Sequence, residues 1–453
     1  MTRTLGRENI STKLLKIAET SKKAPKLVWT TLAHHIDFDF LLEAYRRTRK
    51  DGAAGIDGQK AAEYARQLSA NLTSLCERFK SGAYKAPAVR RSYIPKGDGK
   101  SKRPIGIPTF EDKVLQRAVV MLLEAVYEQD FLNCSYGFRP GRSAHQALGD
   151  LRERLKEIRG GYVVKVDIEK FFDTLDHKQL RSFLDQRVRD GSVRRTIDKW
   201  LKAGVMEEGK VRHLYNGTPQ GGVISPLLAN IYLHEVLDVW FEQIVKPCMK
   251  GYAFVIRYAD DVILGFSEEY DVNRVLKVLP KRFGKYGLRV HSEKTRIIRF
   301  QKPPKKGGSR KGPGSFEFLG FTHYWARHQG MYWVIKRKTA KDRFSRALKR
   351  VKGWCWANRH EPLKWQQRQL TAKLKGHSAY YGISGNAWAL ERFREEVRNI
   401  WRKWLSRRSQ RAYISWERYE QLLKRFPLPK MRVVHSMYGR AAKPSYLLRS
   451  RMR

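Results

Sequence analysis

Two adjacent aspartates lie between two apolar runs in the second half of the chain. The segment VIRYADDVIL (residues 255–264) places Asp260 and Asp261 between Val255-Ile256 and Val262-Ile263-Leu264. Carboxylates are costly to hold beside buried apolar residues unless a cation neutralises them. Because adjacent residues on a strand point to opposite faces, a turn is needed to aim both carboxylates at a common cation. The pattern predicts a β-hairpin with the two aspartates at its turn.

A third carboxylate has a similar setting. Asp167 directly follows the apolar run GYVVKV (residues 161–166), which predicts a buried strand. Three carboxylates around one cavity suit two Mg²⁺ ions, which prefer oxygen ligands. Two such ions, about 3.5–4 Å apart, can activate a 3′-hydroxyl and stabilise a leaving pyrophosphate. A lone Asp-Asp pair is more often a turn or a helix cap, but its combination with Asp167 favours the metal site.

The charge of the chain points to a polyanionic partner. The 453 residues include 92 Lys+Arg and 44 Asp+Glu, which gives a formal net charge of +48. Such a surplus repels itself in a compact state unless a polyanion compensates it. Nucleic acid is the first candidate and an anionic membrane the second. No apolar run approaches the roughly 18 residues of a membrane span.

The first residues and the spacing of the cysteines indicate the compartment and the role of the thiols. The first ten residues, MTRTLGRENI, lack the apolar core of a signal peptide, so we expect a cytoplasmic protein. The four cysteines are widely scattered and form no Cys-x-x-Cys pair. Neither a zinc ribbon nor a disulfide framework is therefore indicated.

Basic residues are concentrated towards the C-terminus. Residues 331–453 contain 32 Lys+Arg and 7 Asp+Glu, so more than half of the surplus lies in the last quarter of the chain. This asymmetry predicts a dedicated nucleic-acid-binding region there. The alternative is a solvated helical face, which salt-dependent binding would distinguish.

The pattern of apolar residues and turn formers predicts a mixture of helices and strands. Helices are expected in residues 1–50, after the glycine-rich turn of residues 51–58 up to about residue 79, in 110–130, in 227–241 and after about 339. Hairpins or strands are expected in residues 91–108, 161–166, 253–266 and 316–325, and a flexible loop in 301–315. The fold class that follows is α+β with a basic helical C-terminal region.

Eight segments, in order, resemble the sequence blocks of the group II intron reverse transcriptase/maturases of bacteria. They are residues 44–58, 93–119, 135–148, 163–177, 218–238, 257–261, 287–297 and 316–321, and the segment TPQGGVISPLLANIYLHEVLD (218–238) is similar along its full length. The resemblance covers nearly the whole chain. It implies a right-hand polymerase fold of fingers and palm, followed by an α-helical basic thumb.

The resemblance also implies a division into domains. Residues 1–90 would form an N-terminal helical extension and the start of the fingers, and residues 91–330 the fingers and palm. Residues 331–440 would be the RNA-binding thumb, called domain X, and residues 441–453 a basic tail. Many members of the family end in an endonuclease with a Cys-pair metal site. Because no cysteine follows Cys355, we expect no such module here.

The same resemblance assigns roles around the metal site. Asp167, Asp260 and Asp261 would bind two Mg²⁺ ions, with the backbone carbonyl of Ile168 completing one shell. The implied nucleotide-binding residues are Arg103 and Lys113 on the triphosphate, Gln220 and Lys294 near the nucleotide, and Phe172, which would exclude a 2′-hydroxyl. Lys102 and Arg117 compete with the two fingers cations, and Phe171 and Phe172 could instead both be core aromatics.

Further residues are expected to contact the nucleic acid. Phe318, Leu319 and Gly320 would form the primer grip. In the thumb, the segment WRKWLSRRSQR (residues 401–411) supplies Arg402, Lys403, Arg407, Arg408 and Arg411 as RNA or template contacts, whereas Trp401 and Trp404 are expected in the core. His145, His177, His213 and His234 have no partner at metal-ligand spacing and are expected to be structural.

The function implied is an RNA-directed DNA polymerase that binds its group II intron RNA and assists splicing and mobility. Its partners would be the intron RNA, an RNA template with a DNA primer or target DNA, and deoxynucleoside triphosphates. Two alternatives stay open. One is a maturase that acts only as an RNA-binding splicing cofactor. The other is a domesticated reverse transcriptase of the same lineage in repair or defence.

Overall fold

A computed structural model describes residues 2–95, 101–158, 161–207, 210–212, 217, 221–303 and 314–436. The chain forms two compact units. Unit 1 comprises Met1–Ala147 and Val164–Ile297, and unit 2 comprises Leu148–Val163 and Ile298–Arg453. The expected domain boundary at residue 330 does not coincide with this division, because strands before that residue cluster with the helices after it. The functional division into fingers, palm and thumb stays a prediction.

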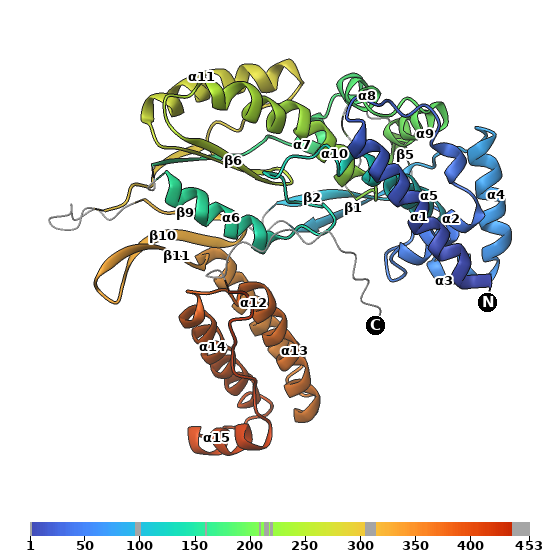
Figure 1. Ribbon diagram of the computed structural model, residues 1–453. Coiled ribbons are helices and arrows are strands. Elements are labelled where there is room, and N and C mark those ends of the chain that lie inside the picture. The colour runs from blue at the N-terminus through green and yellow to red at the C-terminus, as the bar shows by residue number, and fades with distance from the viewer. Residues whose placement is uncertain are drawn as a thin grey trace. The chain divides into compact units, whose positions relative to one another are not determined.

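The first part of unit 1 is helical, as the sequence predicts. Its helices are α1 (Thr2–Lys23), α2 (Phe38–Arg47), α3 (Ala61–Arg66), α4 (Leu68–Lys80) and α5 (Phe110–Tyr127). Helix α5 has buried side chains on most of its circumference, and α1 and α2 pack against it (Figure 1). A helix that is apolar nearly all round lies in the core. The hydroxyl of Thr109 caps its first turn by accepting a hydrogen bond from Asp112 N.

The predicted hairpin of residues 91–108 is present. Strands β1 (Val89–Pro95) and β2 (Lys102–Ile107) pair antiparallel, with Arg90 opposite Ile107 and Pro95 opposite Lys102. The predicted turn, residues 96–100, lies outside the described residues. Strand β1 also pairs in parallel with β4 (Val205–Glu207), and β5 (Lys210–Arg212) completes a sheet of order β2-β1-β4-β5.

A second sheet carries the segments that bear the aspartates. Its order is β6-β7-β3-β8, from β6 (Ala253–Tyr258), β7 (Asp261–Phe266), β3 (Tyr162–Val166) and β8 (Arg296–Arg299). Five successive residues of β6 are buried, so both of its faces are covered. Helix α11 (Glu269–Lys285) contacts β7 (Figure 1). A continuous apolar run is typical of a strand buried on both faces.

The predicted helix of residues 227–241 is present with one difference. Helix α10 (Ser225–Leu233) continues into π-helical turns at His234–Val239 and Phe241–Val245. Such turns are rare and are often found at functional sites. Three more helices, α7 (Phe171–Thr174), α8 (His177–Asp185) and α9 (Gly191–Lys202), lie between β3 and β4 in the chain.

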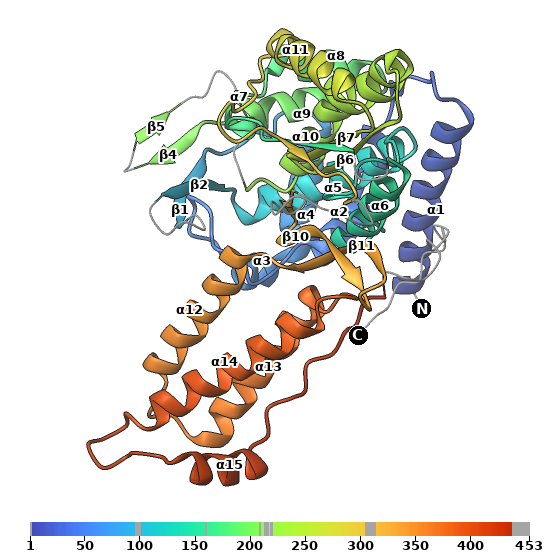
Figure 2. The same ribbon diagram turned by 90° about the vertical axis from the view of Figure 1, so that its left-hand side faces the viewer.

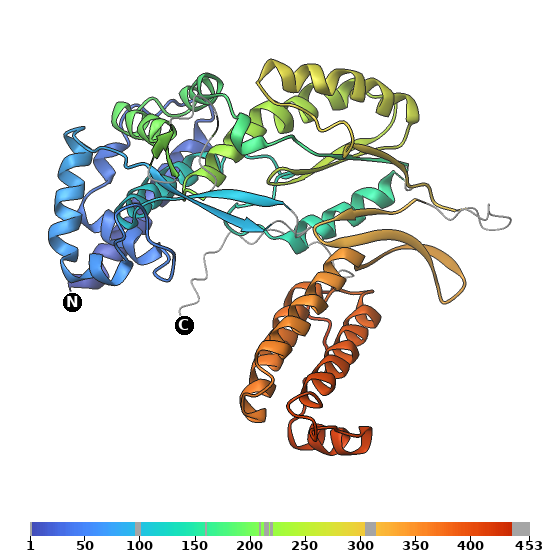
Figure 3. The same cartoon turned by 180° about the vertical axis from the view of Figure 1, so that it is seen from behind.

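Unit 2 contains a small sheet and a group of helices. The sheet has the order β11-β10-β9, from β9 (Phe316–Phe318), β10 (Phe321–His328) and β11 (Tyr332–Thr339). Strands β10 and β11 form a hairpin that extends well beyond the short β9 (Figure 3). Most of helix α6 (Ala144–Glu157) also belongs to this unit.

The helices predicted after residue 339 are α12 (Lys341–Ala357), α13 (Leu363–Tyr381), α14 (Ala387–Leu405) and α15 (Trp416–Arg425). Helix α14 packs against α12 and α13, and α15 lies at the far end of this group (Figure 2). Their common core is formed by Val351, Cys355, Leu370, Leu374, Phe393, Val397, Trp401, Leu405, Tyr419 and Leu428. The core position of Trp401 is confirmed, and Trp404 is partly buried against the same cluster. Among the described residues, no helix is both long and apolar enough to cross a membrane.

Candidate active site

The paired aspartates lie at a hairpin turn, as predicted. Tyr258 pairs with Asp261, so strands β6 and β7 are joined by the two residues Ala259 and Asp260. Ala259 has a φ of +56°, a left-handed conformation that is uncommon for a residue other than glycine. Asp260 and Asp261 are both exposed. The turn therefore presents two carboxylates to solvent at the end of a buried hairpin.

A buried arginine fixes this turn from below. The Arg257 side chain is fully buried and donates from Nε and Nη2 to the Asp238 carboxylate, at 2.8 and 2.5 Å. Its Nη1 donates to Asn230 Oδ1 at 2.8 Å and to the carbonyl of Ala259 at 3.1 Å. Burial alone would lower the pKa of Arg257, but the Asp238 carboxylate raises it above its usual value. The guanidinium thus stays charged and ties the turn to the helix that carries Asn230 and Asp238.

A glycine lies directly against the turn. A Cβ atom at Gly137 would lie 2.3 Å from Ala259 N, so only glycine allows this approach. The carbonyl of Gly137 accepts a hydrogen bond from Asn230 Nδ2 at 2.8 Å. The main chain of Arg257 is also held, because its N–H donates to Cys134 O and its carbonyl accepts from Tyr136 N. The segment before Phe138 is therefore part of the support of the turn.

Sequence reasoning missed Asn230, Asp238 and Gly137 as supporting residues. Asn230 and Asp238 are polar residues in the mainly apolar stretch LLANIYLHEVLDVWF (residues 227–241), and both are buried. A buried polar residue in an apolar helix requires a polar partner. That pattern could have identified both residues, but it does not reveal that the partner is Arg257.

Asp167 directly follows strand β3, the neighbour of β7 in the sheet. Its carboxylate is partly exposed, and its Oδ1 lies 3.9 Å from Nζ of Lys294. The carbonyl of Asp167 accepts a hydrogen bond from His291 N at 2.9 Å. Segment 291–295 therefore fixes the main chain of Asp167, and Lys294, predicted near the nucleotide, lies beside the Asp167 carboxylate.

The main chain of Ile168, the predicted carbonyl ligand, lies beside residues 289–291. Ile168 forms an antiparallel bridge with Val290, and the hydrogen bonds on either side run from Glu169 N to Arg289 O and from His291 N to Asp167 O. In such a pair the N–H and C=O of the central residue point away from the partner segment. The carbonyl of Ile168 thus faces away from residues 289–291 and is not used in that bridge.

The donor set fits a hard divalent cation. The carboxylates of Asp260 and Asp261 are exposed and that of Asp167 is partly exposed, and these residues lie at the ends of the neighbouring strands β7 and β3. Ile168 offers a main-chain oxygen. These are the ligands that Mg²⁺ prefers. Within the described ranges, no three His, Cys, Asp or Glu side chains are gathered into a ready-made metal site. The three aspartates thus lie on adjacent segments without forming a closed cluster.

The two phenylalanines after Asp167 have different surroundings. Phe171 is 3% exposed, and its ring centroid lies 6.4 Å from that of Tyr232. Phe172 is partly exposed, with its ring edge-on to Phe171 at 5.3 Å. Phe171 is therefore a core aromatic, whereas Phe172 has part of its surface accessible to a ligand.

The predicted nucleotide contact Gln220 lies outside the described residues, but glycines on both sides of it are well anchored. Gly217 has a φ of +87°, and a Cβ there would lie 2.7 Å from Phe172 O. His177 Nε2 lies 2.5 Å from Gly217 O. This contact agrees with the structural role expected for His177. Gly221 has a φ of +119° and packs on Gly106 of β2.

A buried polar network holds the main chain just after these glycines. Gln116 Oε1 accepts hydrogen bonds from Val223 N at 2.7 Å and Ile224 N at 3.3 Å, and its Nε2 donates to Asp112. The Asp112 carboxylate also accepts from Trp200 Nε1 at 2.7 Å and from the hydroxyl of Tyr84. Burial raises the pKa of Asp112 to about 6. Helix α5 therefore supports the segment that carries the predicted nucleotide contact.

The fingers cations differ in their availability. Arg103 is exposed on β2 opposite Ile94, and Lys102 beside it is also exposed. Lys113 is partly buried and donates to the carbonyl of Ala53 at 2.7 Å, and burial lowers its pKa. Lys113 thus holds the glycine-rich loop of residues 51–58, a role that the sequence analysis did not predict. The competing Arg117 is partly buried on α5.

The predicted primer grip is a second two-residue turn. Phe318 pairs with Phe321, so Leu319 and Gly320 join β9 to β10, with φ values of +49° and +79°. Tyr380 donates its hydroxyl to Leu319 O at 2.9 Å, and Ala340 N donates to Gly320 O at 3.0 Å. Phe318 is buried, so the turn itself is the accessible part.

The five predicted contact cations of residues 402–411 divide into two groups. Arg402 donates to Ile414 O and lies 4.0 Å from the Trp416 ring, and Arg408 donates to Glu361 O at 2.9 Å. These two stabilise the end of helix α14. The other three, Lys403, Arg407 and Arg411, are exposed. These three side chains are therefore the ones of the five that solvent reaches most fully.

Histidines contribute little to the site. His234 is buried, and burial lowers its pKa to about 4. Such a group is neutral at physiological pH and fits the predicted structural role. His213 lies outside the described residues.

Comparison with known proteins gives the family. Residues 94–323, about half of the chain, match the family "Reverse transcriptase (RNA-dependent DNA polymerase)". The group II intron-encoded protein LtrA of Lactococcus lactis subsp. cremoris is 44% identical over 165 residues, which cover 36% of this chain and 27% of that protein. Protein YkfC of Escherichia coli (strain K12) is 40% identical over 203 residues, 44% of this chain and 53% of that protein.

A plant protein matches as well. The protein "Nuclear intron maturase 2, mitochondrial" of Arabidopsis thaliana is 29% identical over 229 residues, which cover 40% of this chain and 30% of that protein. The chain thus spans between about a quarter and a half of the length of these relatives. The chain belongs to the reverse transcriptase family, and its relatives include group II intron-encoded proteins.

Proposed function

We propose that this chain is an Mg²⁺-dependent RNA-directed DNA polymerase. The observation that carries the proposal is the exposed Asp260–Asp261 turn, which the buried Arg257 fixes. This turn leads into β7, and Asp167 directly follows β3, the neighbour of β7 in the sheet. Reverse transcriptases use divalent metal ions. Two Mg²⁺ ions are the choice that best suits carboxylate and carbonyl oxygens.

In this proposal each residue has one task. Asp167, Asp260, Asp261 and the carbonyl of Ile168 hold the ions, which supply activation of the primer 3′-hydroxyl and stabilisation of the leaving pyrophosphate. Arg257 fixes the position of the turn through Ala259 O. Lys294 offsets the charge of Asp167.

The remaining predicted residues position the nucleotide and the primer. Arg103, which is exposed, is assigned to the triphosphate, and Lys113, which also holds Ala53 O, is its predicted partner there. Gln220 is assigned to the incoming nucleotide, and Phe318, Leu319 and Gly320 to the primer end. Fixed cations that face developing negative charge stabilise a transition state. Gln116 supports the Gln220 assignment indirectly, because it holds the main chain of Val223, which follows Gly221 and Gly222.

We further propose that the protein binds a group II intron RNA and assists its splicing and mobility. The support is the similarity to LtrA and to an intron maturase, together with the net charge of +48. The exposed cations of α14 and the following loop supply phosphate contacts. Target DNA and an RNA template with a DNA primer are the substrates that the polymerase reaction requires.

Primer extension tests the polymerase. The wild type and Asp260→Asn/Asp261→Asn are compared on an RNA template with a DNA primer, deoxynucleotides and Mg²⁺. We expect cDNA from the wild type and none from the double variant. Wild-type protein that binds RNA tightly but makes no cDNA would favour the maturase that acts only as an RNA-binding cofactor.

The assignment of Phe172 has a separate test. Phe172→Ala should increase ribonucleotide incorporation by about tenfold or more relative to deoxynucleotides, because the ring no longer excludes the 2′-hydroxyl. Phe171→Leu is the matched control, since Phe171 is buried. An unchanged ratio in Phe172→Ala would remove the assignment.

A further inference from the structure

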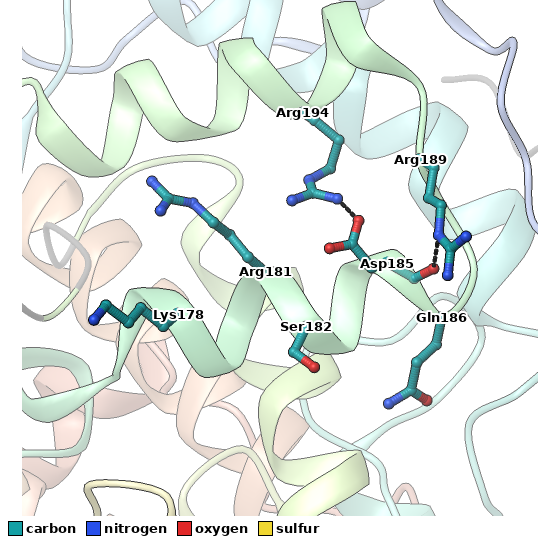
Figure 4. Close-up of a pocket in the computed structure, with 7 residues that line it drawn as sticks. All are labelled: Lys178, Arg181, Ser182, Asp185, Gln186, Arg189 and Arg194. Carbon is teal, nitrogen blue, oxygen red and sulfur yellow. Dashed lines mark hydrogen bonds and ion pairs between the residues drawn. The ribbon is translucent and has the colours of Figure 1, made fainter.

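A basic pocket lies between helices α8 and α9 in unit 1, outside all the residues assigned above. Its volume is about 480 Å³, and its lining residues are Lys178, Arg181, Ser182, Asp185, Gln186, Arg189 and Arg194 (Figure 4). Four of the seven are cations and one is an anion. An excess of positive charge in a concave surface attracts an anionic ligand.

The polar face of α8 forms one wall of the pocket. Lys178, Arg181, Ser182 and Asp185 are spaced i, i+3, i+4 and i+7, so they share one face of the helix. The opposite face contains the buried Leu180, Phe183 and Leu184. The cations therefore project from a helix whose orientation is fixed by its core side.

Two of the cations are held in place by ion pairs. Arg194 pairs with Asp185, and Arg181 Nε donates to Asp198 at 2.6 Å (Figure 4 shows the first pair). The Nε atom of Arg194 is buried, and no protein group in the described part of the chain accepts a hydrogen bond from it. The pairs orient these guanidinium groups without using all their donors.

The other two cations keep their charge free. Nε of Arg189 donates to the carbonyl of Asp185 at 3.0 Å, which leaves both Nη groups directed away from that bond. Lys178 is exposed. Within the described ranges, no carboxylate forms an ion pair with Lys178 or Arg189. These two side chains therefore supply the net positive charge of the pocket.

The loop that carries Arg189 is rigidly supported from behind. Arg187 is 6% exposed, pairs with Asp130 at 2.8 Å and donates to the carbonyls of Pro25 and Leu27. Trp29 N donates a hydrogen bond to Arg187 O, and Arg189 N donates one to Trp29 O, so the main chain on both sides of Val188 is held by Trp29.

Asp190 completes this support. Its carboxylate accepts hydrogen bonds from Ser192 N and Val193 N at the start of α9, and from Leu32 N and Ala33 N. A binding group on a fixed loop loses little conformational entropy when it binds. Arg189 is therefore preorganised for an external partner, in contrast to a cation on a mobile surface loop.

We propose that this pocket binds the phosphodiester backbone of RNA. Planar guanidinium groups match the geometry of phosphate oxygens, and Ser182 and Gln186 add neutral donors at the rim. The choice of RNA over other polyanions rests on the proposed function, in which a structured RNA is the largest partner. The pocket would add an RNA contact in unit 1 to those of the thumb cations.

The test removes only the two unpaired charges. Lys178→Ala/Arg189→Ala keeps both ion pairs and the buried support of the loop intact. Lys277→Ala/Lys281→Ala on α11 is the matched control, because it removes the same charge from exposed positions outside the pocket. Binding of a fluorescein-labelled RNA hairpin to the full chain is measured by anisotropy between about 50 and 200 mM KCl.

We expect the pocket variant to bind the hairpin roughly 5- to 10-fold more weakly, with the slope of log K against log[KCl] reduced by about 1.5–2. Arg189→Lys should retain only part of the affinity, because it keeps the charge but not the planar set of donors. Equal effects in the pocket variant and the control would overturn the proposal. Unchanged binding of the RNA hairpin, with weaker binding only of duplex DNA or of polyglutamate, an acidic polypeptide, would overturn it as well.

Primer extension on a short template separates this proposal from the proposed function. The pocket variant should retain wild-type extension, since the pocket includes none of the assigned active-site residues. If the wild type makes no cDNA but the salt slope still changes, the polymerase assignment fails and the RNA pocket stands. If cDNA is made and the slope is unchanged, the RNA pocket fails alone.

Discussion

Two tight turns, one in each unit, are built alike and supported differently. Ala259–Asp260 joins β6 to β7, and Leu319–Gly320 joins β9 to β10. Each has two residues, and each begins with a non-glycine residue at positive φ, +56° for Ala259 and +49° for Leu319. In the proposed function the first turn belongs to the metal site, and the second is the predicted primer grip.

The supports show what each turn must resist. The Ala259 carbonyl is held by a fully buried, charged arginine, which is itself paired with a fully buried aspartate. The Leu319 carbonyl is held by the neutral hydroxyl of Tyr380. A turn next to two carboxylates experiences their mutual repulsion and, in the proposed function, the attraction of bound metal, so a charged and rigid support suits it. The second turn carries no charged side chain, and neutral hydrogen bonds suffice to hold it.

The largest predicted effect comes from breaking the charged support. Arg257→Met leaves the Asp238 carboxylate buried without its partner, which should lower the free energy of unfolding by about 3–5 kcal/mol. The measurement is urea unfolding. cDNA synthesis should also fall sharply, because the turn loses its bond to Ala259 O.

A double variant separates charge from packing. Arg257→Met/Asp238→Leu removes both charges and should recover much of the stability without recovering activity. If the single variant unfolds at the same urea concentration as the wild type, the ion pair is not what supports the turn.

These supports mark the limit of what the sequence predicts. The hairpin and its turn follow from the VIRYADDVIL pattern, and the helices after residue 339 follow from apolar spacing, because both are local patterns. Arg257 bonds to Asp238 and Asn230, and Asn230 bonds to Gly137, so this network joins three segments far apart in the chain. No local pattern reveals that kind of pairing.

Arg103 and Lys113 give a second example of a tertiary contact that the sequence does not reveal. Arg103 and Lys113 look equivalent as basic residues in one sequence block. The structure leaves Arg103 exposed and binds Lys113 to the carbonyl of Ala53. Whether a cation is used inside the fold depends on tertiary contacts, so the sequence alone assigns both to the same role.

The next effect in size concerns the small sheet of unit 2. His323 on β10 is fully buried and stacked on Phe316, and burial, together with the nearby Arg337, lowers its pKa to about 3. The unfolded chain binds a proton below about pH 6.5 and the folded chain does not, so stability falls as the pH drops below that value. The loss should approach about 2 kcal/mol by pH 5.

His323→Phe should remove the part of the acid sensitivity that His323 causes and leave the part that the buried His234 causes. The ring can keep its stacking on Phe316, and no buried imidazole nitrogen remains. Urea midpoints of the wild type and the variant, measured at pH 7 and pH 5, provide the comparison. An equal change in the midpoint of both proteins between these pH values would show that another group causes the acid sensitivity.

A smaller effect is expected from the neutral support of the second turn. Tyr380→Phe removes the hydroxyl bond to Leu319 O and should cost about 1 kcal/mol. In primer extension the KM for the primer–template should rise severalfold, with little change in kcat. Tyr381→Phe is the matched control, because its ring also contacts Phe321 but its hydroxyl does not bond to Leu319. Equal effects in the two variants would contradict the support assigned to Tyr380.

The smallest effect is predicted at the positive φ itself. Ala259→Gly relieves the strain of a left-handed alanine, worth about 1 kcal/mol, but increases the entropy of the unfolded chain by a similar amount. The net change in stability should stay within about 0.5 kcal/mol. A large loss of stability would mean that the methyl group of Ala259 itself packs in the folded protein.

The central claim is that Asp167 and the Asp260–Asp261 turn bind the same metal ions. Fe²⁺ in place of Mg²⁺, with ascorbate and peroxide, generates hydroxyl radicals that cut the main chain beside a bound ion. With a primer–template present, we predict cuts next to both Asp167 and Asp260, suppressed by excess Mg²⁺ and absent in Asp260→Asn/Asp261→Asn. Cuts at only one of the two segments, or cuts that Mg²⁺ does not suppress, would contradict the shared site.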